Sequence, residues 1–252
     1  MRSTISGLIH MFFGRFPQER KLFIVVFFAA FCLIARWALA DASVHFFSEA
    51  GPNAVAIIAA IVDLTGSQTS NLPHLFVWAA IQFLSFFLFP ALFLWITRPK
   101  AFEVLRFPKQ SSHWKPYGIL LLVMIVPLFF ASRMSSFQET YPFLRFGQAG
   151  FNWQAFLFWE ILYALQFVAV EFFFRGFLLI GMLPVLGEAA LAVSILPYVM
   201  IHFGKPLPEV FGAAIAGWVL ARLAFKTGSI VPGILLHYAI ALSMDLLSLA
   251  QK

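Results

Sequence analysis

Long, uninterrupted apolar runs recur along this chain, and they limit its possible folds more than any other feature. The clearest cover residues 22–40, 74–97 and 229–249. A helix needs about 20 apolar residues to cross a bilayer, and only helices and closed barrels satisfy their backbone polar groups there. Because the runs are continuous and do not alternate, the sequence predicts an all-α bundle. With 62% hydrophobic and 11% charged residues, a soluble domain is excluded.

The apolar runs predict seven or eight transmembrane helices in a polytopic bundle. The eighth depends on residues 43–65, which form either a span or a half-span lying at the interface. The whole chain, residues 1–252, is interpreted as one integral membrane domain. The seven clearer spans are 22–40, 74–97, 117–131, the part of the run 151–183 that begins near residue 160, 188–203, 209–225 and 229–249.

Charged residues cluster between the apolar runs and indicate how the chain crosses the membrane. Residues 98–116 contain five basic residues and one acidic residue, Glu103. Because an excess of Lys and Arg marks cytoplasmic loops, this loop and the N-terminus are expected in the cytoplasm and the acidic stretch 41–73 outside. The net charge of +6 is therefore a topology signal, and no nucleic-acid partner is expected. The compact layout fits a bacterial inner-membrane protein.

The first apolar run is interpreted as an uncleaved helix that follows a basic segment at the membrane surface. Ala38-Leu39-Ala40 resembles a signal-peptidase site, so a cleaved signal peptide is the alternative. The basic region is long for a signal peptide, which favours the uncleaved helix. The single cysteine, Cys32, excludes a disulfide framework and a cysteine metal cluster.

The central apolar run contains a carboxylate and a guanidinium, Glu171 and Arg175. Residues four apart lie on one face of a helix, so the two charges can neutralise each other. An unpaired charge at mid-membrane costs about 2.5–3.5 kcal/mol, and intramembrane ionisable groups are functional candidates by default. The alternative is a structural ion pair that fixes helix packing. Trp153 and Trp159, near the start of the run, are expected at the membrane interface.

A helix break follows the next apolar run, and polar residues gather at it. His202 precedes a segment whose glycine and prolines stop the helix, and Lys205 and Glu209 lie in or just after that segment. A break at membrane depth is tolerated only where protein buries it or a wet cavity borders it. The alternative is a simple extramembrane turn in which His202 caps a helix end.

The last two apolar runs carry a packing signal and a second histidine. His237, Ala241 and Asp245 follow one another at steps of four, which places them on one helix face. Asp245 either orients a polar partner or caps the helix. Small residues in the preceding run allow close helix packing and are assigned no chemistry: Gly212, Ala213, Ala216 and Gly217.

These residues resemble the CPBP family, the CAAX proteases and bacteriocin-processing (Abi) enzymes, which are glutamate-dependent intramembrane endopeptidases. The family pattern is Glu-Glu-x-x-x-Arg, then Phe-x-x-x-His, then His-x-x-x-Asn or Asp. The three parts correspond here to Val170-Glu171-x-x-x-Arg175, Tyr198-x-x-x-His202 and His237-x-x-x-Ala241. The resemblance covers residues 153–248, which it implies form the catalytic core.

Two positions depart from the family pattern. Val170 replaces the glutamate that the family uses as general base, and Ala241 replaces the residue that helps to form the oxyanion hole. One hypothesis is a rewired endopeptidase in which Glu171 or Glu209 is the base, His202 orients the water and His237 donates to the oxyanion. The predicted catalytic residues are Glu171, Arg175, His202, Glu209 and His237, with Lys205 and Asp245 in support.

Other hypotheses remain open. An inactive homologue would use the same cavity to bind a hydrophobic peptide, a lipid or a membrane-protein partner. A transport or proton-relay site ranks last, because the sequence has no inverted repeat. Two histidines and two carboxylates could bind zinc, but the resemblance implies a mechanism without a cofactor, and none is expected. The expected partners are the lipid bilayer and a membrane-associated peptide or lipidated protein as substrate.

Overall fold

A computed structural model describes residues 17–49, 71–97, 99–108, 110, 113–146 and 150–251, and every regular element in them is a helix. This confirms the all-α class. In chain order the helices are α2 (Pro17–Glu49), α4 (Leu72–Phe83), the π-helix η1 (Leu84–Leu88), α5 (Phe89–Thr97), the 3₁₀-helix η2 (Pro99–Leu105), α6 (Lys115–Ala131), α7 (Ser135–Thr140), α8 (Trp153–Glu171), the π-helix η4 (Phe172–Leu179), α9 (Ile180–Leu186), α10 (Ala189–Met200), α11 (Leu207–Thr227) and α12 (Val231–Leu249).

Five helical segments of the described chain are long and apolar enough to cross a membrane, which makes this an integral membrane protein. Two further predicted spans form α6 and α10, of 17 and 12 residues. Both are shorter than the roughly 20 residues that a perpendicular span needs, so a count of seven or eight spans stays a prediction. Most of the stretch 43–65 lies outside the described residues. The five segments are Leu22–Ala40, Leu72–Ile96, Trp153–Leu186, Leu207–Thr227 and Val231–Leu249.

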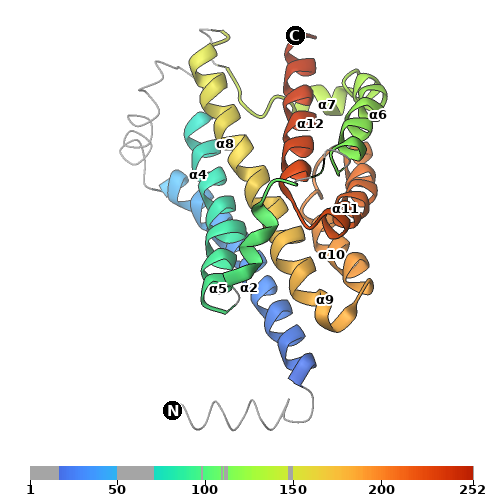
Figure 1. Ribbon diagram of the computed structural model, residues 1–252. Coiled ribbons are helices and arrows are strands. Elements are labelled where there is room, and N and C mark those ends of the chain that lie inside the picture. Colours follow the sequence, from blue (N-terminus) through green and yellow to red (C-terminus); the bar gives the residue numbers. More distant parts are fainter. Residues whose placement is uncertain are drawn as a thin grey trace.

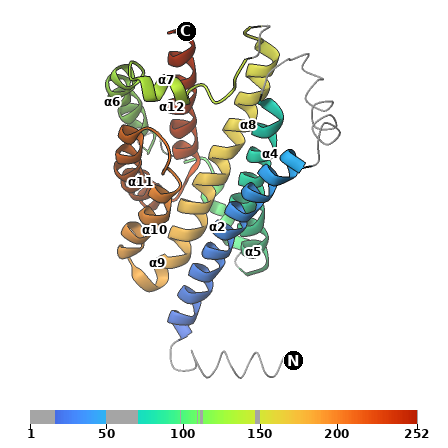
Figure 2. The ribbon, with the colours of Figure 1, turned by 180° about the vertical axis from the view of Figure 1, so that it is seen from behind.

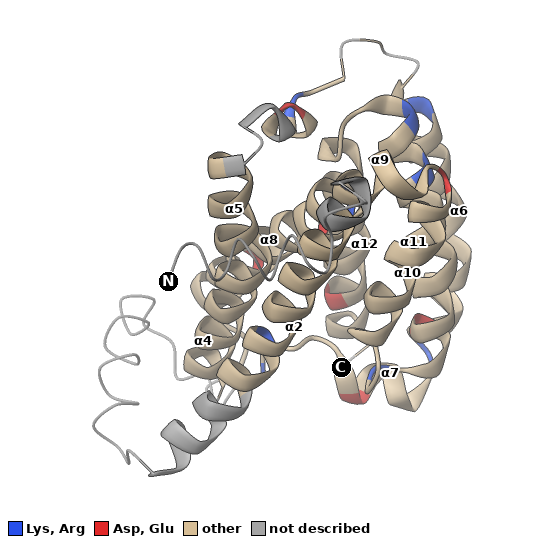
Figure 3. Cartoon of the chain, turned by 90° about the horizontal axis from the view of Figure 1, so that it is seen from below, with Lys and Arg blue, Asp and Glu red and all other residues tan. Residues whose placement is uncertain are grey.

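The central rod of the bundle consists of α8, η4 and α9, which follow one another without a break. In Figure 1, α2, α4 and α5 lie on one side of this rod and α6, α7, α11 and α12 on the other. Figure 2, seen from behind, shows α2 in front, slanting alongside the lower part of the rod. Charged residues interrupt the described helices at few places, as Figure 3 shows from below. The rod is apolar on nearly all faces because helices cover it on both sides.

Aromatic packing fixes the middle of the rod. Phe172, Phe173 and Phe174 are completely buried, and the ring of Phe173 stacks on Phe86 of η1 at a centroid distance of 4.6 Å. Here the sequence predicted a regular helix, whereas the structure has the π-helix η4. π-Helical turns are rare and frequently occur at functional sites. The turn begins directly after Glu171.

One expectation about the helix ends was wrong. Trp153 is 65% exposed, but Trp159 is completely buried within the protein and does not face the lipid as a belt residue would. The basic loop 98–116 also makes contacts within the bundle. The carbonyl of Val104 in η2 accepts a hydrogen bond from Ile230 N at 3.0 Å, and Ser229 Oγ donates to Arg106 O at 2.6 Å. This loop therefore packs against the start of α12.

Glycine lets α10 and α11 approach each other closely, as the small residues of α11 predicted. A Cβ atom at Gly217 would lie 2.8 Å from Cδ1 of Tyr198, whereas a Cβ at Gly212 meets nothing within 4 Å. Tyr198 cannot easily move away, because its ring packs 5.3 Å from Phe174 and 4.0 Å from the Arg175 guanidinium carbon. The absence of a side chain at Gly217 thus leaves the space that the ring of Tyr198 occupies.

The substitution Gly217→Ala is expected to destabilise the bundle by about 1–3 kcal/mol through overpacking. This loss exceeds the gain of about 1 kcal/mol in helix propensity. Gly212→Ala in the same helix is the matched control and should be neutral or slightly stabilising. Thermal unfolding in detergent micelles measures both. Equal midpoints for the two variants would contradict the close contact between α10 and α11.

Candidate active site

Glu171 and Arg175 form the predicted ion pair in the middle of the rod. Arg175 Nη1 donates to Glu171 Oε1 at 3.0 Å, and both side chains are at most 2% exposed. Glu171 is the last residue of α8 and Arg175 lies in η4, so the π-helical turn begins between them. In such an environment each charge needs the other, because a lone buried charge is very costly.

The carboxylate of Glu171 also contacts a third predicted residue. His237 Nδ1 lies 2.9 Å from the same oxygen, Glu171 Oε1. Gly233, one turn earlier on α12, lies beside this carboxylate, and a Cβ atom there would be in ordinary contact with Glu171 Oε2 at 3.4 Å. The ring of His237 packs against Phe167 at a centroid distance of 4.5 Å. Glu171 therefore connects the rod to α12 through a polar contact.

Tyr198 joins this group to the second histidine. Its ring lies under the guanidinium of Arg175, with 4.0 Å between the guanidinium carbon and the ring centroid, which is a cation–π geometry. Its backbone carbonyl bonds Nδ1 of His202 at 2.8 Å. A carbonyl only accepts hydrogen bonds, so His202 Nδ1 carries a hydrogen and its Nε2 is left available.

Glu209 lies in the first turn of α11, where a carboxylate is favourable. Lys205 Nζ donates to Glu209 Oε1 at 2.6 Å, and Tyr141 OH donates to Oε2 at 2.6 Å. Burial, reinforced by Tyr163 and Glu209, raises the pKa of Tyr141 well above its usual value, so the hydroxyl remains a donor. Sequence reasoning missed Tyr141, because residues 132–152 looked like a polar connection with no motif.

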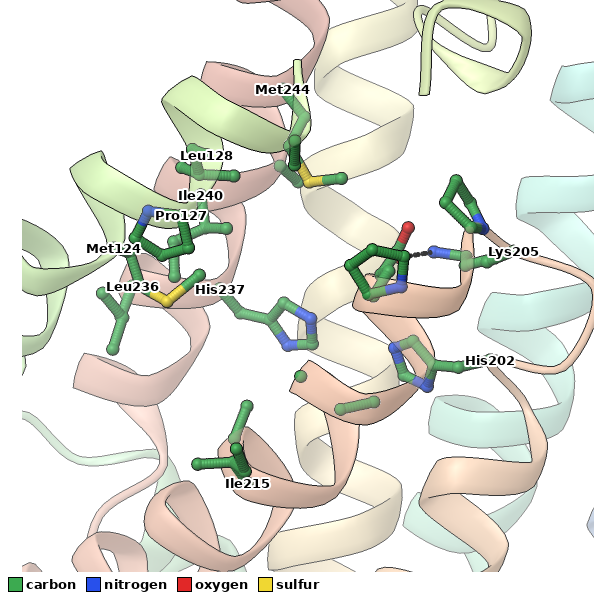
Figure 4. Close-up of a pocket in the computed structure, with 18 of the residues that line it drawn as sticks. Met124, Pro127, Leu128, His202, Lys205, Ile215, Leu236, His237, Ile240 and Met244 are labelled. Carbon is green, nitrogen blue, oxygen red and sulfur yellow. Dashed lines mark hydrogen bonds and ion pairs between the residues drawn. The ribbon is translucent and has the colours of Figure 1, made fainter. Parts of the chain in front are cut away.

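One cavity of about 370 Å³ brings several of these residues together. Its wall consists of parts of α6, α7, α8, α10, α11 and α12 and of the turn before α11. Figure 4 shows the imidazoles of His202 and His237 pointing toward each other across this space. Most of the remaining lining is apolar. Glu171 and Arg175 do not line the cavity but lie behind His237. The polar and charged lining residues include His202, Lys205, Glu209, His237, Tyr141, Tyr163 and Tyr198.

Asp245 does not belong to the polar residues that line the cavity. Its Oδ2 accepts a hydrogen bond from Trp159 Nε1 at 3.2 Å, and the nearby Glu160 accepts one from Tyr238 OH at 3.2 Å. Glu160 Oε1 and Asp245 Oδ1 are buried and have no hydrogen-bond partner among the described residues. One proton held between the two carboxyl groups would satisfy both oxygens. Asp245 thus belongs to a separate polar contact between α8 and α12.

Both departures from the family pattern are apolar side chains in buried surroundings. Val170 is 4% exposed and packs in the main hydrophobic core, and Ala241 is 4% exposed and borders the cavity. Neither supplies a polar atom. Within the described residues, no three His, Cys, Asp or Glu side chains are arranged to hold a metal ion.

Residues 152–243 match the family model described as "Type II CAAX prenyl endopeptidase Rce1-like". This match confirms the resemblance to the CPBP family over that part of the chain, where it had been predicted for residues 153–248. Comparisons with curated proteins and with solved structures found no match. The catalytic roles assigned to individual residues stay predictions.

The substitution Arg175→Met should destabilise the protein by about 3–5 kcal/mol, because it leaves Glu171 buried without its cation. The double variant Glu171→Leu/Arg175→Met should lose less than the sum of the two single changes, since it removes both charges. Thermal unfolding in detergent measures the stability of the two single variants, Glu171→Leu and Arg175→Met, and of the double variant.

The matched control is Arg222→Met. Arg222 pairs with Glu188 at 3.0 Å, but their side chains are 32% and 68% exposed, and an exposed pair contributes at most about 1 kcal/mol. Additive losses for the Glu171 and Arg175 substitutions would show that the two charges do not depend on each other.

Proposed function

Because residues 152–243 match a family of CAAX-type membrane proteases, we propose that this protein is an intramembrane endopeptidase. It hydrolyses a peptide bond of a membrane-associated substrate, either a hydrophobic peptide or a lipidated protein. The observation that supports this most strongly is the shared cavity: His202, Glu209 and His237 come from different helices or turns and all line one space. Convergence of such groups is what acid–base chemistry on a bound peptide requires.

The cavity combines a polar end with a long apolar wall. Side chains such as Leu128, Ile240 and Met244 form the apolar part, which favours burial of an apolar segment or lipid chain. Lys205 and Glu209 form an ion pair whose side chains are 27% and 19% exposed. This pair can hydrogen bond the polar backbone of a peptide. In a substrate with an apolar part next to a peptide bond, the apolar part fits the apolar wall of the cavity and the peptide bond fits its polar end.

The two carboxylates expected as possible bases differ in their positions. Glu171 is 1% exposed, and its Oε1 already has Arg175 and His237 as partners. Glu209 borders the cavity, but Lys205 and Tyr141 each occupy one of its oxygens. Glu209 is therefore better suited to bind the substrate than to take a proton from water.

An inactive homologue is the second candidate function, and the two departures favour it. Val170 and Ala241 offer no polar atom where the family pattern has a general base and an oxyanion donor. Such a protein would use the same apolar cavity to hold a hydrophobic peptide, a lipid or a membrane-protein partner without hydrolysis.

We further infer a bacterial inner-membrane location with the N-terminus in the cytoplasm. The compact layout of the chain fits that membrane, and the charge asymmetry of the sequence supports the orientation, because the basic loop 98–116 contrasts with the acidic stretch 41–73. Glycosylation or cysteine-labelling reporters in these two segments would test the orientation.

Endopeptidase activity is tested in proteoliposomes with membrane-anchored peptides, each made with and without a prenyl chain. Wild type should cleave at least one of them. His202→Ala should reduce the rate by about 10²-fold, because it removes a group that positions the water or the substrate. Glu209→Gln should mainly raise KM.

Glu188→Gln is the matched carboxylate control and should be unchanged, because Glu188 is largely exposed and does not line the cavity. Peptide binding without cleavage by wild type would support the inactive homologue instead.

A further inference from the structure

We propose that His237 is the general base of this site and that Glu171 is the residue that positions it. This inference rests on the proposed endopeptidase function and assigns the group that replaces the absent carboxylate at Val170. Its basis is geometric: a buried carboxylate bonds Nδ1 of an imidazole whose other side faces the cavity.

The hydrogen-bond partner of His237 fixes which ring nitrogen carries a hydrogen. Glu171 Oε1 receives a charged donor from Arg175 at 3.0 Å, so Glu171 is an ionised acceptor. His237 Nδ1, at 2.9 Å from the same oxygen, must then be the donor. In the neutral imidazole this leaves Nε2 without a hydrogen. A bare Nε2 bordering the cavity can accept a proton from a water molecule.

The surroundings of Glu171 hold this geometry in place. Glu171 is 1% exposed, so no water competes for its oxygens, and Arg175 keeps it anionic. Gly233 lies beside the carboxylate on α12, and Phe167 packs against the imidazole ring. The side chain of His237 remains 16% exposed. The imidazole is therefore anchored at Nδ1 and accessible elsewhere.

His202 differs from His237 in the charge of its partner. Its Nδ1 faces the neutral carbonyl of Tyr198, whereas Nδ1 of His237 faces a carboxylate. A base becomes positively charged when it accepts a proton, and an anion next to it stabilises that form. This contrast assigns the proton-accepting role to His237 and leaves His202 to orient the water or the substrate.

The reaction balances with water alone. A water proton moves to His237 Nε2, the water oxygen bonds to the carbonyl carbon, and the carbonyl π electrons move to its oxygen. When the tetrahedral intermediate collapses, the C–N bond breaks and the proton on Nε2 passes to the departing nitrogen. The products are a carboxylic acid and an amine, and His237 returns to its neutral form. Glu171 keeps its charge throughout and touches no reacting atom.

The first test compares kinetics of the full-length protein in proteoliposomes. His237→Ala should lower kcat by about 10³ or more. Glu171→Gln should lower kcat by about 10²–10⁴ with KM within threefold, because a glutamine can donate to Nδ1 and so favour the wrong tautomer. Glu171→Asp should recover part of the lost kcat. Equal kcat in wild type and Glu171→Gln, or an active His237→Ala, would overturn the assignment.

The second test does not depend on hydrolysis and so separates this inference from the proposed function. Diethyl pyrocarbonate acylates unprotonated imidazole nitrogen, and mass spectrometry locates the adduct. His237 should react at least several times faster in wild type than in Glu171→Gln, while His202 should react alike in both. A wild type that cleaves nothing but shows this difference would overturn the endopeptidase and support the activated histidine. Equal acylation of His237 in both proteins would overturn the pairing.

Discussion

The burial of one negative charge governs the centre of this protein. Glu171 lies midway along the longest apolar helix and is 1% exposed, which is tolerable only because Arg175 and His237 both contact its Oε1. The two contacts arise differently. Arg175 is four residues away on the same rod, whereas His237 comes from α12, 66 residues later. Satisfying the charge therefore also requires α12 to dock at one height and in one rotation.

The local backbone of the rod and its neighbours is built around that requirement. The π-helical segment begins after Glu171 and includes Arg175, Tyr198 covers the guanidinium, and Gly233 lies beside the carboxylate. Gly217 in turn leaves space for Tyr198 of α10 to lie against α11. A larger residue at Gly217 would displace Tyr198 from the Arg175 guanidinium, so packing and electrostatics cannot be changed independently here.

Much of this arrangement was predictable from the sequence. Apolar run lengths predicted the five segments of the described chain that are long enough to span a membrane, and the spacing of four predicted the Glu171–Arg175 pair, since both follow from local geometry. The pairing of Glu171 with His237 was not predictable from spacing. It depends on how two helices far apart in the sequence are rotated relative to each other, and no local sequence pattern predicts that rotation.

The same limit explains the errors. Tryptophan is a residue type expected at a membrane interface, yet Trp159 is completely buried and donates a hydrogen bond to Asp245. Asp245 shares a helix face with His237 by spacing, but it lies two turns further along α12 and contacts a different part of α8. Tyr141 was missed because it lies in an irregular segment, and its bond to Glu209 joins residues 68 positions apart.

The buried charges alone do not distinguish an enzyme from a binding protein, because an ion pair that orients helices would be equally well satisfied. Exposure of the two histidines to the cavity is a second observation to set beside the ion pair. A purely structural histidine would have both ring nitrogens occupied, as the cost of leaving a buried polar atom unpaired demands. His237 and His202 each have Nδ1 bonded within the protein and border one shared cavity. Two imidazoles fixed at one nitrogen and open to a common space leave the other nitrogen accessible to water or to a bound molecule, which an enzyme and a binding protein could both use.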